Sequence, residues 1–331
     1  IRIREVPDTT DRYWVGSAGG AWNDNNNWSS SANTCGVGGG SSYPVAGDTA
    51  YFVSNCTNNI TLTASVSAAA ITNTGGYTGT FTTSNNAITL TGSFQWDAGT
   101  FTAGSSTITV AGNFTADGGA SSTGFNSASL VLTGTGNLTY TNLSAPWANG
   151  FYNLTCGQNG NTTTTNSTFG VNNLLTIGSG TLTGTGWIDL NGGPDVLSFN
   201  SASTLSVGTI EFYKTSSVNI PTLNNGYGCD IIVGNDGTTV NQTGNITLNS
   251  GKNLRIIADN FTGRTCTWNT NGYSLTVGGY IELGVAGDTV TKTLNITNST
   301  LTVGGNFTIA STQAVFTTTG STVIFNGSGT Q

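Results

Sequence analysis

A short phrase that recurs along this chain constrains its fold more than any other feature of the sequence. The phrase is a hydrophobic residue, a second residue that is mostly polar, another hydrophobic residue and, one or two places later, a glycine. Adjacent clear copies follow one another after 20 to 26 residues. This period, combined with strand-type alternation, is typical of stacked coils. The copies occupy residues 88–92, 108–112, 130–134, 205–208, 275–279, 301–305 and 323–327.

A single coil of this kind cannot bury its own hydrophobic side chains, so the coils must stack. Stacked strands lie about 4.8 Å apart, which would give an inner column of Val, Ile, Leu and Phe with Thr and Asn outside. The sequence therefore predicts an all-β fold, a parallel β-helix (β-solenoid) of roughly a dozen coils over residues 58–331. The alternative is a β-sandwich or a propeller, because the Asn-Gly pairs of this chain would suit hairpins.

The charge content excludes several classes of function. Only 8 residues are Lys or Arg and 15 are Asp or Glu, the net charge is −7, and there is no His. This excludes His-based catalysis and His metal ligands. Nucleic-acid binding needs clustered positive charge, so we expect no nucleic-acid partner. The 14 Phe, 10 Tyr and 7 Trp argue against disorder. No apolar run is long enough to cross a bilayer, so we expect no membrane insertion.

The start of the chain indicates export. The sequence begins at Ile1 rather than at Met, and we interpret it as a mature chain whose signal has been removed, or as a fragment. We divide it into an N-terminal strand and linker (1–12), a small Trp- and Cys-containing cap module (13–57) and the solenoid (58–331). The expected location is extracellular or on the cell surface.

The five cysteines fit an oxidising compartment. Cys35 and Cys56 flank one compact segment, and we predict a disulfide between them. A second disulfide is predicted between Cys229 and Cys266, which leaves Cys156 buried or linking two chains. A zinc site is excluded, because the chain has no C-x-x-C motif and no His.

Residues 13–57 carry a resemblance to a known class of proteins. They contain the letters YWVG at 13–16, W at 22, NW at 27–28 and PVAGD at 44–48, followed by Tyr51 and Phe52. This resembles the start of many bacterial secreted repeat proteins of the autotransporter-adhesin and surface-fibre type, in which such a module precedes Thr/Asn/Gly-rich solenoid coils. The resemblance covers nearly the whole chain. It implies a surface or extracellular role and names no ligand.

Both ends of the chain suggest self-association. The first six residues alternate like a strand, and Pro7 then interrupts it. At the far end the last repeat stops without a charged strand or a helix as a lid, which exposes unpaired backbone groups. A donated N-terminal strand could pair there with a neighbouring subunit, whereas the alternative is a strand that caps its own chain. The predicted subunit-interface residues are Ile1, Arg2, Ile3, Arg4, Val6, Val323 and Phe325.

Carboxylates are the only residues that could form a catalytic constellation. Asp189 and Glu211 are 22 residues apart, and Asp259 and Glu282 are 23 apart, so each pair is separated by about one coil. With Asp236 between them, these acids could line one outer face as a cation site or a glycosidase-like pair. We favour solvated acids that keep the face soluble, because few Arg or Lys accompany them. We therefore predict no enzyme, no cofactor and no metal site.

Two weaker signals concern ligands. Asp24 and the asparagines after it offer oxygen ligands for calcium, but no Glu closes the loop. Tryptophans could stack on sugar rings, although such residues more often fill a core. The candidates are Trp22, Trp28, Trp96, Trp147, Trp187 and Trp268.

N-glycosylation sequons are frequent, as the Asn and Thr content makes inevitable. In a host with that pathway, outward-facing corners are the expected sites. The selected candidates are Asn59, Asn113, Asn137, Asn153, Asn245, Asn295 and Asn306.

Taken together, the sequence favours a structural subunit of an extracellular filament or surface layer. Assembly would be head-to-tail, by strand pairing at uncapped solenoid ends, with the chain itself as partner. The alternatives are a monomeric surface adhesin or passenger segment that binds glycans and, less favoured, a carbohydrate-active enzyme on a β-helix.

Overall fold

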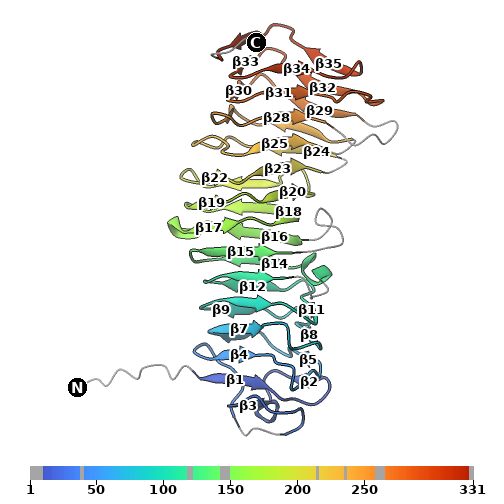
Figure 1. The fold of residues 1–331 in the computed structure, drawn as a ribbon. Helices are drawn as coiled ribbons and strands as arrows, with labels where there is room; N and C mark the ends of the chain where they lie inside the picture. Colours follow the sequence, from blue (N-terminus) through green and yellow to red (C-terminus); the bar gives the residue numbers. More distant parts are fainter. Residues whose placement is uncertain are drawn as a thin grey trace, which may run out of the picture. The chain divides into compact units, whose positions relative to one another are not determined.

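The computed structural model describes residues 10–37, 41–117, 122–141, 150–213, 216–234, 237–257 and 265–327. The chain is nearly all-β, with 3% helix, and its parallel strands stack as a β-solenoid (Figure 1). It divides into two compact units, residues 1–155 and 156–331. Together the units contain about 11 turns. The predicted all-β solenoid is confirmed.

The repeated phrase forms the coils as expected. Ile88 pairs in register with Ile108, and Leu90 with Val110, and all four side chains are buried. The intervening threonines face outward. Because successive side chains of a strand alternate between its faces, this register builds one buried column and one exposed column.

The first unit stacks its strands in three sheets, with 3₁₀ turns at η1 (Asn25–Asn27) and η2 (Ser122–Phe125). One sheet runs β3 (Trp28–Ser29), β1 (Asp11–Trp14), β4 (Thr49–Tyr51), β7 (Ala70–Asn73), β10 (Phe94–Trp96), β13 (Phe114–Ala116), β15 (Gly136–Tyr140). The second runs β2 (Gly20–Ala21), β5 (Ile60–Thr61), β8 (Thr80–Thr82), β11 (Thr100–Thr102). The third runs β6 (Val66–Ala68), β9 (Ile88–Leu90), β12 (Thr107–Val110), β14 (Ser129–Leu132), β16 (Gly150–Cys156).

The core of the first unit is aromatic. Phe52 and Trp96 pack edge to face with their ring centroids 5.3 Å apart, and Phe94 stacks on Phe114 at 4.9 Å. Each such pair stabilises the fold by about 0.5–1.5 kcal/mol beyond the contribution from burying its apolar surface. Stacked rings from successive coils therefore hold the unit together from inside.

The N-terminal end of this unit is packed with tryptophans. Strand β3 runs antiparallel to β1 and pairs Trp28 with Trp14. The side chains of Trp14, Trp22 and Trp28 are at most 1% exposed. Gly16 permits this packing, because a Cβ there would lie 2.5 Å from the Trp14 ring. The three indoles therefore lie in the core at this end of the unit, where β2, β3 and β6 are the last strands of their sheets.

The second unit has its own stacked sheets, with a 3₁₀ turn at η3 (Gln158–Gly160). One run is β17 (Thr162–Thr165), β19 (Thr181–Thr183), β22 (Thr204–Ser206), and another is β27 (Ile246–Leu248), β30 (Leu275–Val277), β33 (Thr300–Val303), β36 (Thr322–Phe325). The longest is β18 (Thr168–Ile177), β20 (Trp187–Leu190), β23 (Thr209–Phe212), β25 (Asp230–Val233), β28 (Leu254–Ile256), β31 (Ile281–Leu283), β34 (Phe307–Ile309), with β21 (Leu197–Phe199) beside β18. The last is β24 (Ser217–Ile220), β26 (Thr239–Gln242), β29 (Cys266–Asn269), β32 (Lys292–Asn295), β35 (Ala314–Thr317).

The core of the second unit is mainly aliphatic. One inward position carries a branched aliphatic residue in five successive coils, and each of these side chains is fully buried. Burying such a side chain stabilises the fold by about 1.5–3 kcal/mol. The column consists of Ile188, Ile210, Ile231, Leu254 and Ile281.

One turn is used twice. The letters VAGDT occur at 45–49 and again at 285–289. In the first copy the Asp48 N–H donates to Val45 O at 2.8 Å, and the Val45 N–H donates to Asp48 Oδ2 at 3.1 Å. Asp288 and Val285 make the same two bonds, at 3.2 and 2.7 Å. Identical sequence therefore closes an identical turn in each unit.

Candidate functional site

The last coil of the second unit leaves strand edges uncovered. β34, β35 and β36 each lie at the end of a sheet, so among the described residues one edge of each strand has no neighbouring strand. Such an edge presents a row of backbone N–H and C=O groups to any strand that can pair with it.

The side chains of this coil are also uncovered. Ile309 is 52% exposed and Phe325 is 51% exposed. One coil earlier, Leu301 and Val303, which pair in register with Val323 and Phe325, are fully buried. The hydrophobic column therefore continues to the end of the described chain without a lid.

The predicted interface residues fall in two places. Phe325 lies on the open edge, and Val323 lies beside it and is half-buried. The sequence therefore identified two residues of this edge but missed Ile309, whose strand shows no repeat phrase of its own. The remaining five, Ile1, Arg2, Ile3, Arg4 and Val6, lie outside the described residues.

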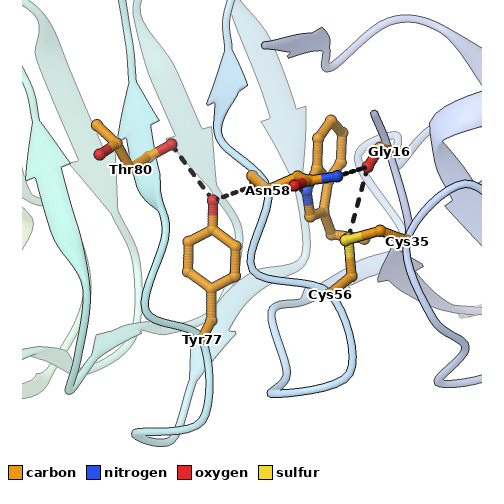
Figure 2. The surroundings of a disulfide bond; sticks show 7 residues. Gly16, Cys35, Cys56, Asn58, Tyr77 and Thr80 are labelled. Carbon is orange, nitrogen blue, oxygen red and sulfur yellow. Dashed lines mark hydrogen bonds between the residues drawn. A yellow bond between two sulfur atoms is a disulfide. The ribbon is translucent and has the colours of Figure 1, made fainter. Parts of the chain in front are cut away.

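A disulfide fixes the cap region (Figure 2). Cys35 and Cys56 are bonded, with their Cα atoms 4.6 Å apart. The Cys56 sulfur lies 3.5 Å from Gly16 O, which also accepts the Asn58 side-chain N–H at 3.1 Å. The Tyr77 hydroxyl donates to Asn58 O at 2.7 Å, and burial raises the pKa of that hydroxyl far above its usual range. The bond thus ties a surface loop to the first coils.

The second predicted disulfide is wrong. Cys229 and Cys266 are buried and are not bonded to each other. Cys229 precedes β25 and stacks in the column of Lys252, whereas Cys266 pairs in register with Lys292 on another sheet. Because the two columns belong to different sheets, the stacking of coils does not place the two thiols next to each other. Cys156 is also buried, which raises the pKa of its thiol to about 12.

Two carboxylates meet on the outer side of β20 and β23. Asp189 and Glu211 pair in register, as their spacing predicted. The Trp187 indole N–H lies 2.7 Å from Asp189 Oδ1 and 3.0 Å from Glu211 Oε2. Burial raises the pKa of Asp189 to about 6, although the bonds to Trp187 and Glu211 oppose the shift. Asp189 is only 2% exposed, so a glycoside could not reach it without rearrangement.

The remaining predicted acids do not extend this pair. Glu282 forms an ion pair with Arg255, whose Nε–H donates to Glu282 Oε2 at 2.7 Å. Asp236 and Asp259 lie outside the described residues. Asp24 Oδ1 accepts the Asn26 N–H at 2.9 Å and so caps η1. Within the described ranges no three Cys, Asp or Glu side chains gather as metal ligands.

The tryptophans mostly fill the interior. Trp22, Trp28, Trp96 and Trp268 are at most 1% exposed, and Trp147 lies outside the described residues. Of the six candidates for sugar stacking, Trp187 alone is known to reach the surface, with 36% exposure.

A pocket of about 240 Å³ lies beside the cap region. It opens between the loop around Tyr43 and Val45 and the turn from Thr63 to Ser67. Its lining carries hydroxyl groups, the aromatic side chains of Trp22 and Tyr43, and no charged side chain. Such a lining suits a small neutral polar ligand.

The predicted glycosylation sites differ in exposure. Five of the seven are exposed, namely Asn59, Asn113, Asn137, Asn245 and Asn306. Asn153 and Asn295 are half-buried, and their side-chain N–H groups donate to Ser129 at 2.9 Å and to Asn269 at 3.3 Å. Because the sugar is attached to that nitrogen, the five exposed asparagines are the better acceptors.

No protein-family model, curated protein or solved structure matches this chain. In the part of the chain that the structure describes, no helix is long and apolar enough to cross a membrane.

Proposed function

We propose that this protein is a structural subunit that assembles head-to-tail into an extracellular filament. The observation that carries the proposal is the open last coil, where three strand edges coincide with the uncovered side chains of Ile309 and Phe325. A second copy is the occupant that fits, because the chain supplies its own alternating segment at residues 1–6.

The two kinds of end make the proposed contact directional. At the first coil the side chains of Trp14, Trp22 and Trp28 are buried, whereas Ile309 and Phe325 of the last coil are exposed. A contact between an N-terminal segment and an open C-terminal coil joins two different surfaces. A contact of that kind that does not close into a ring produces a filament.

The test is negative-stain electron microscopy of three forms of the purified chain. We expect filaments from the full chain and none from a form lacking residues 1–6 or from the variant V323D/F325D. Mixing the last two forms should yield dimers in size-exclusion chromatography, because one retains the donor and the other the acceptor. Filaments from the shortened form, or monomers from the full chain, would contradict the proposal.

The pocket beside the cap region supports a second candidate, a monomeric adhesin that binds a glycan. Tyr43 is 36% exposed there and could stack on a sugar ring. Binding of oligosaccharides on a glycan array, lost in Y43A, would favour this alternative if the full chain proves monomeric. An extracellular location follows from either candidate, and the disulfide is compatible with it.

A further inference from the structure

A buried ion pair in the second unit is poorly satisfied as it stands. Lys292 Nζ lies 3.9 Å from Asp288 Oδ2, and neither side chain has any exposed surface. The ammonium group donates to Val290 O at 3.3 Å and to no other acceptor among the described residues. In the same part of the chain, Asp288 Oδ1 is buried and accepts no hydrogen bond. A buried ion pair offsets its desolvation only with close geometry and full hydrogen bonding, so keeping this pair ionised is unfavourable.

The fold holds the two side chains against each other. Asp288 belongs to the second VAGDT turn, in which its Oδ2 accepts the Val285 N–H at 2.7 Å. Lys292 opens β32 on the inward side, where it pairs in register with the fully buried Cys266 of β29. Because hydrogen bonds fix both the turn and the strand, the amine cannot move away from the carboxyl group into solvent.

The two oxygens of the Asp288 carboxyl group are not equivalent. Oδ2 is bonded to the Val285 N–H, whereas Oδ1 has no partner among the described residues. An N–H donor on one oxygen stabilises the negative charge that develops there when a nucleophile attacks the carbon. The geometry therefore makes Asp288 Cγ the electrophile and Oδ1 the oxygen that can leave.

We propose that Lys292 and Asp288 are joined by an isopeptide bond, an amide between the two side chains. A proton passes from Nζ to the carboxylate, which leaves an uncharged amine, a nucleophile, beside an uncharged acid. Nζ then attacks Cγ, the N–C bond forms and the Cγ–Oδ1 bond breaks. Oδ1 leaves as water with the acid proton and a second proton from Nζ. One ammonium and one carboxylate thus give one amide and one water, and no oxidant is consumed.

Burial favours this reaction. In water the hydration of the two ions opposes their conversion to an amide, but the fold has already removed that hydration from both groups. The reactants are held within one turn of one chain, so the step is unimolecular. The product replaces two buried charges by one neutral amide, whose Oδ2 can keep its bond from Val285.

The first copy of the turn is an internal comparison. There Arg12 Nε lies 3.8 Å from Asp48 Oδ2, in place of a lysine. A guanidinium stays protonated in proteins and cannot act as the nucleophile. Only the second turn should therefore form the bond. The proposal is independent of filament assembly, because both residues lie in one unit of one chain.

The test is mass spectrometry of the reduced, denatured chain from a host without N-glycosylation. We expect the native chain to be one water lighter than its sequence. Lys292 is the last Lys or Arg of the chain, and the one before it is Arg264. Trypsin should fail to cut at an acylated Lys292, so residues 265–331 should remain one peptide. The matched variant K292R should have its full sequence mass and should be cut after residue 292.

Three results would overturn the proposal. A native chain with its full sequence mass would show that the pair stays ionic. A water loss found in a released peptide 265–292 would indicate cyclisation of Asp288 onto its own backbone. A water loss retained in K292R would exclude Lys292 as the nucleophile. The first two results are read from the native chain alone, so they decide the matter even if K292R does not fold.

Discussion

At the scale of single residues, corner asparagines join each coil to the next. The side-chain oxygen of Asn113 accepts the Asn137 N–H at 2.9 Å, and Asn166 accepts the Thr185 N–H at 2.9 Å. The Asn137 N–H lies near the start of β15 and the Thr185 N–H lies between β19 and β20, and each is bonded by the coil before it. The sequence is therefore rich in Asn for a structural reason. The same bond is made by Asn59, Asn85, Asn245 and Asn253.

The buried carboxylate of Asp189 should make stability depend on pH. Its pKa is raised by burial to about 6 in the folded chain, from an ordinary value of 3.8. The folded state therefore binds the proton more tightly, and stability should fall as pH rises from about 4 to about 6. The loss in the free energy of unfolding over this range is at most about 3 kcal/mol. Chemical denaturation at a series of pH values measures it.

The variant D189N provides the control, because its amide does not titrate. Its free energy of unfolding should vary less with pH over the same range than that of the native chain. An unchanged pH slope in D189N would assign the dependence to other groups and contradict this account.

The indole N–H of Trp268 should matter as much as its ring. It donates to Gln242 Oε1 at 2.9 Å in a buried environment, and the Gln242 amide N–H donates to two backbone carbonyls. In W268F the Gln242 oxygen loses this donor and stays buried without it. We expect the unpaired oxygen to lower the free energy of unfolding by about 1–3 kcal/mol, in addition to the effect of lost packing. Urea unfolding of W268F and of W268F/Q242L separates the effect of the unpaired oxygen from that of the lost packing. A W268F variant as stable as the native chain would contradict the assignment.

At the scale of elements, the repeated VAGDT turn places a buried acid beside a cation in each unit. Asp48 Oδ2 lies 3.8 Å from Arg12 Nε, and Asp288 Oδ2 lies 3.9 Å from Lys292 Nζ. Lys292 is fully buried on the inward side of β32. A buried charge must be paired, and the turn supplies the partner: Asp288 lies four residues before Lys292, whereas Asp48 lies 36 residues after Arg12. Sequence reasoning noted the first turn within the cap module and missed its second copy.

The Cys35–Cys56 disulfide should contribute measurably to stability. It closes a segment with a sequence separation of 21 residues, for which loop-closure entropy gives about 3 kcal/mol. We expect the variant C35S/C56S to unfold at lower denaturant concentration than the native chain. Reductant should destabilise the native chain and leave the variant unchanged. A variant as stable as the native chain would show that the cap region holds without the bond.

At the scale of the whole molecule, the chain treats its two ends differently. The tryptophans at the start of the first unit are buried, whereas hydrophobic side chains are exposed at the end of the second. Terminal repeats with a polar outer face keep repeat proteins soluble. The exposed side chains of the last described coil are the surface on which the proposed assembly depends.

Much of the architecture follows from the sequence alone. Alternation and period are local properties, so the repeat phrase sufficed to predict stacked parallel coils. The pairing of Asp189 with Glu211 followed as well, because their spacing equals one coil. The Cys35–Cys56 bond was predictable because it closes a short segment.

Only the tertiary structure decided which distant residues share a column. Coil length varies, so Asn253 reaches Tyr280 after 27 residues while Asn166 reaches Thr185 after 19. The extra residues lie between the strands, so the columns stay in register while the sequence separation of stacked residues changes from coil to coil. Counting along the sequence therefore could not separate Cys229 from Cys266.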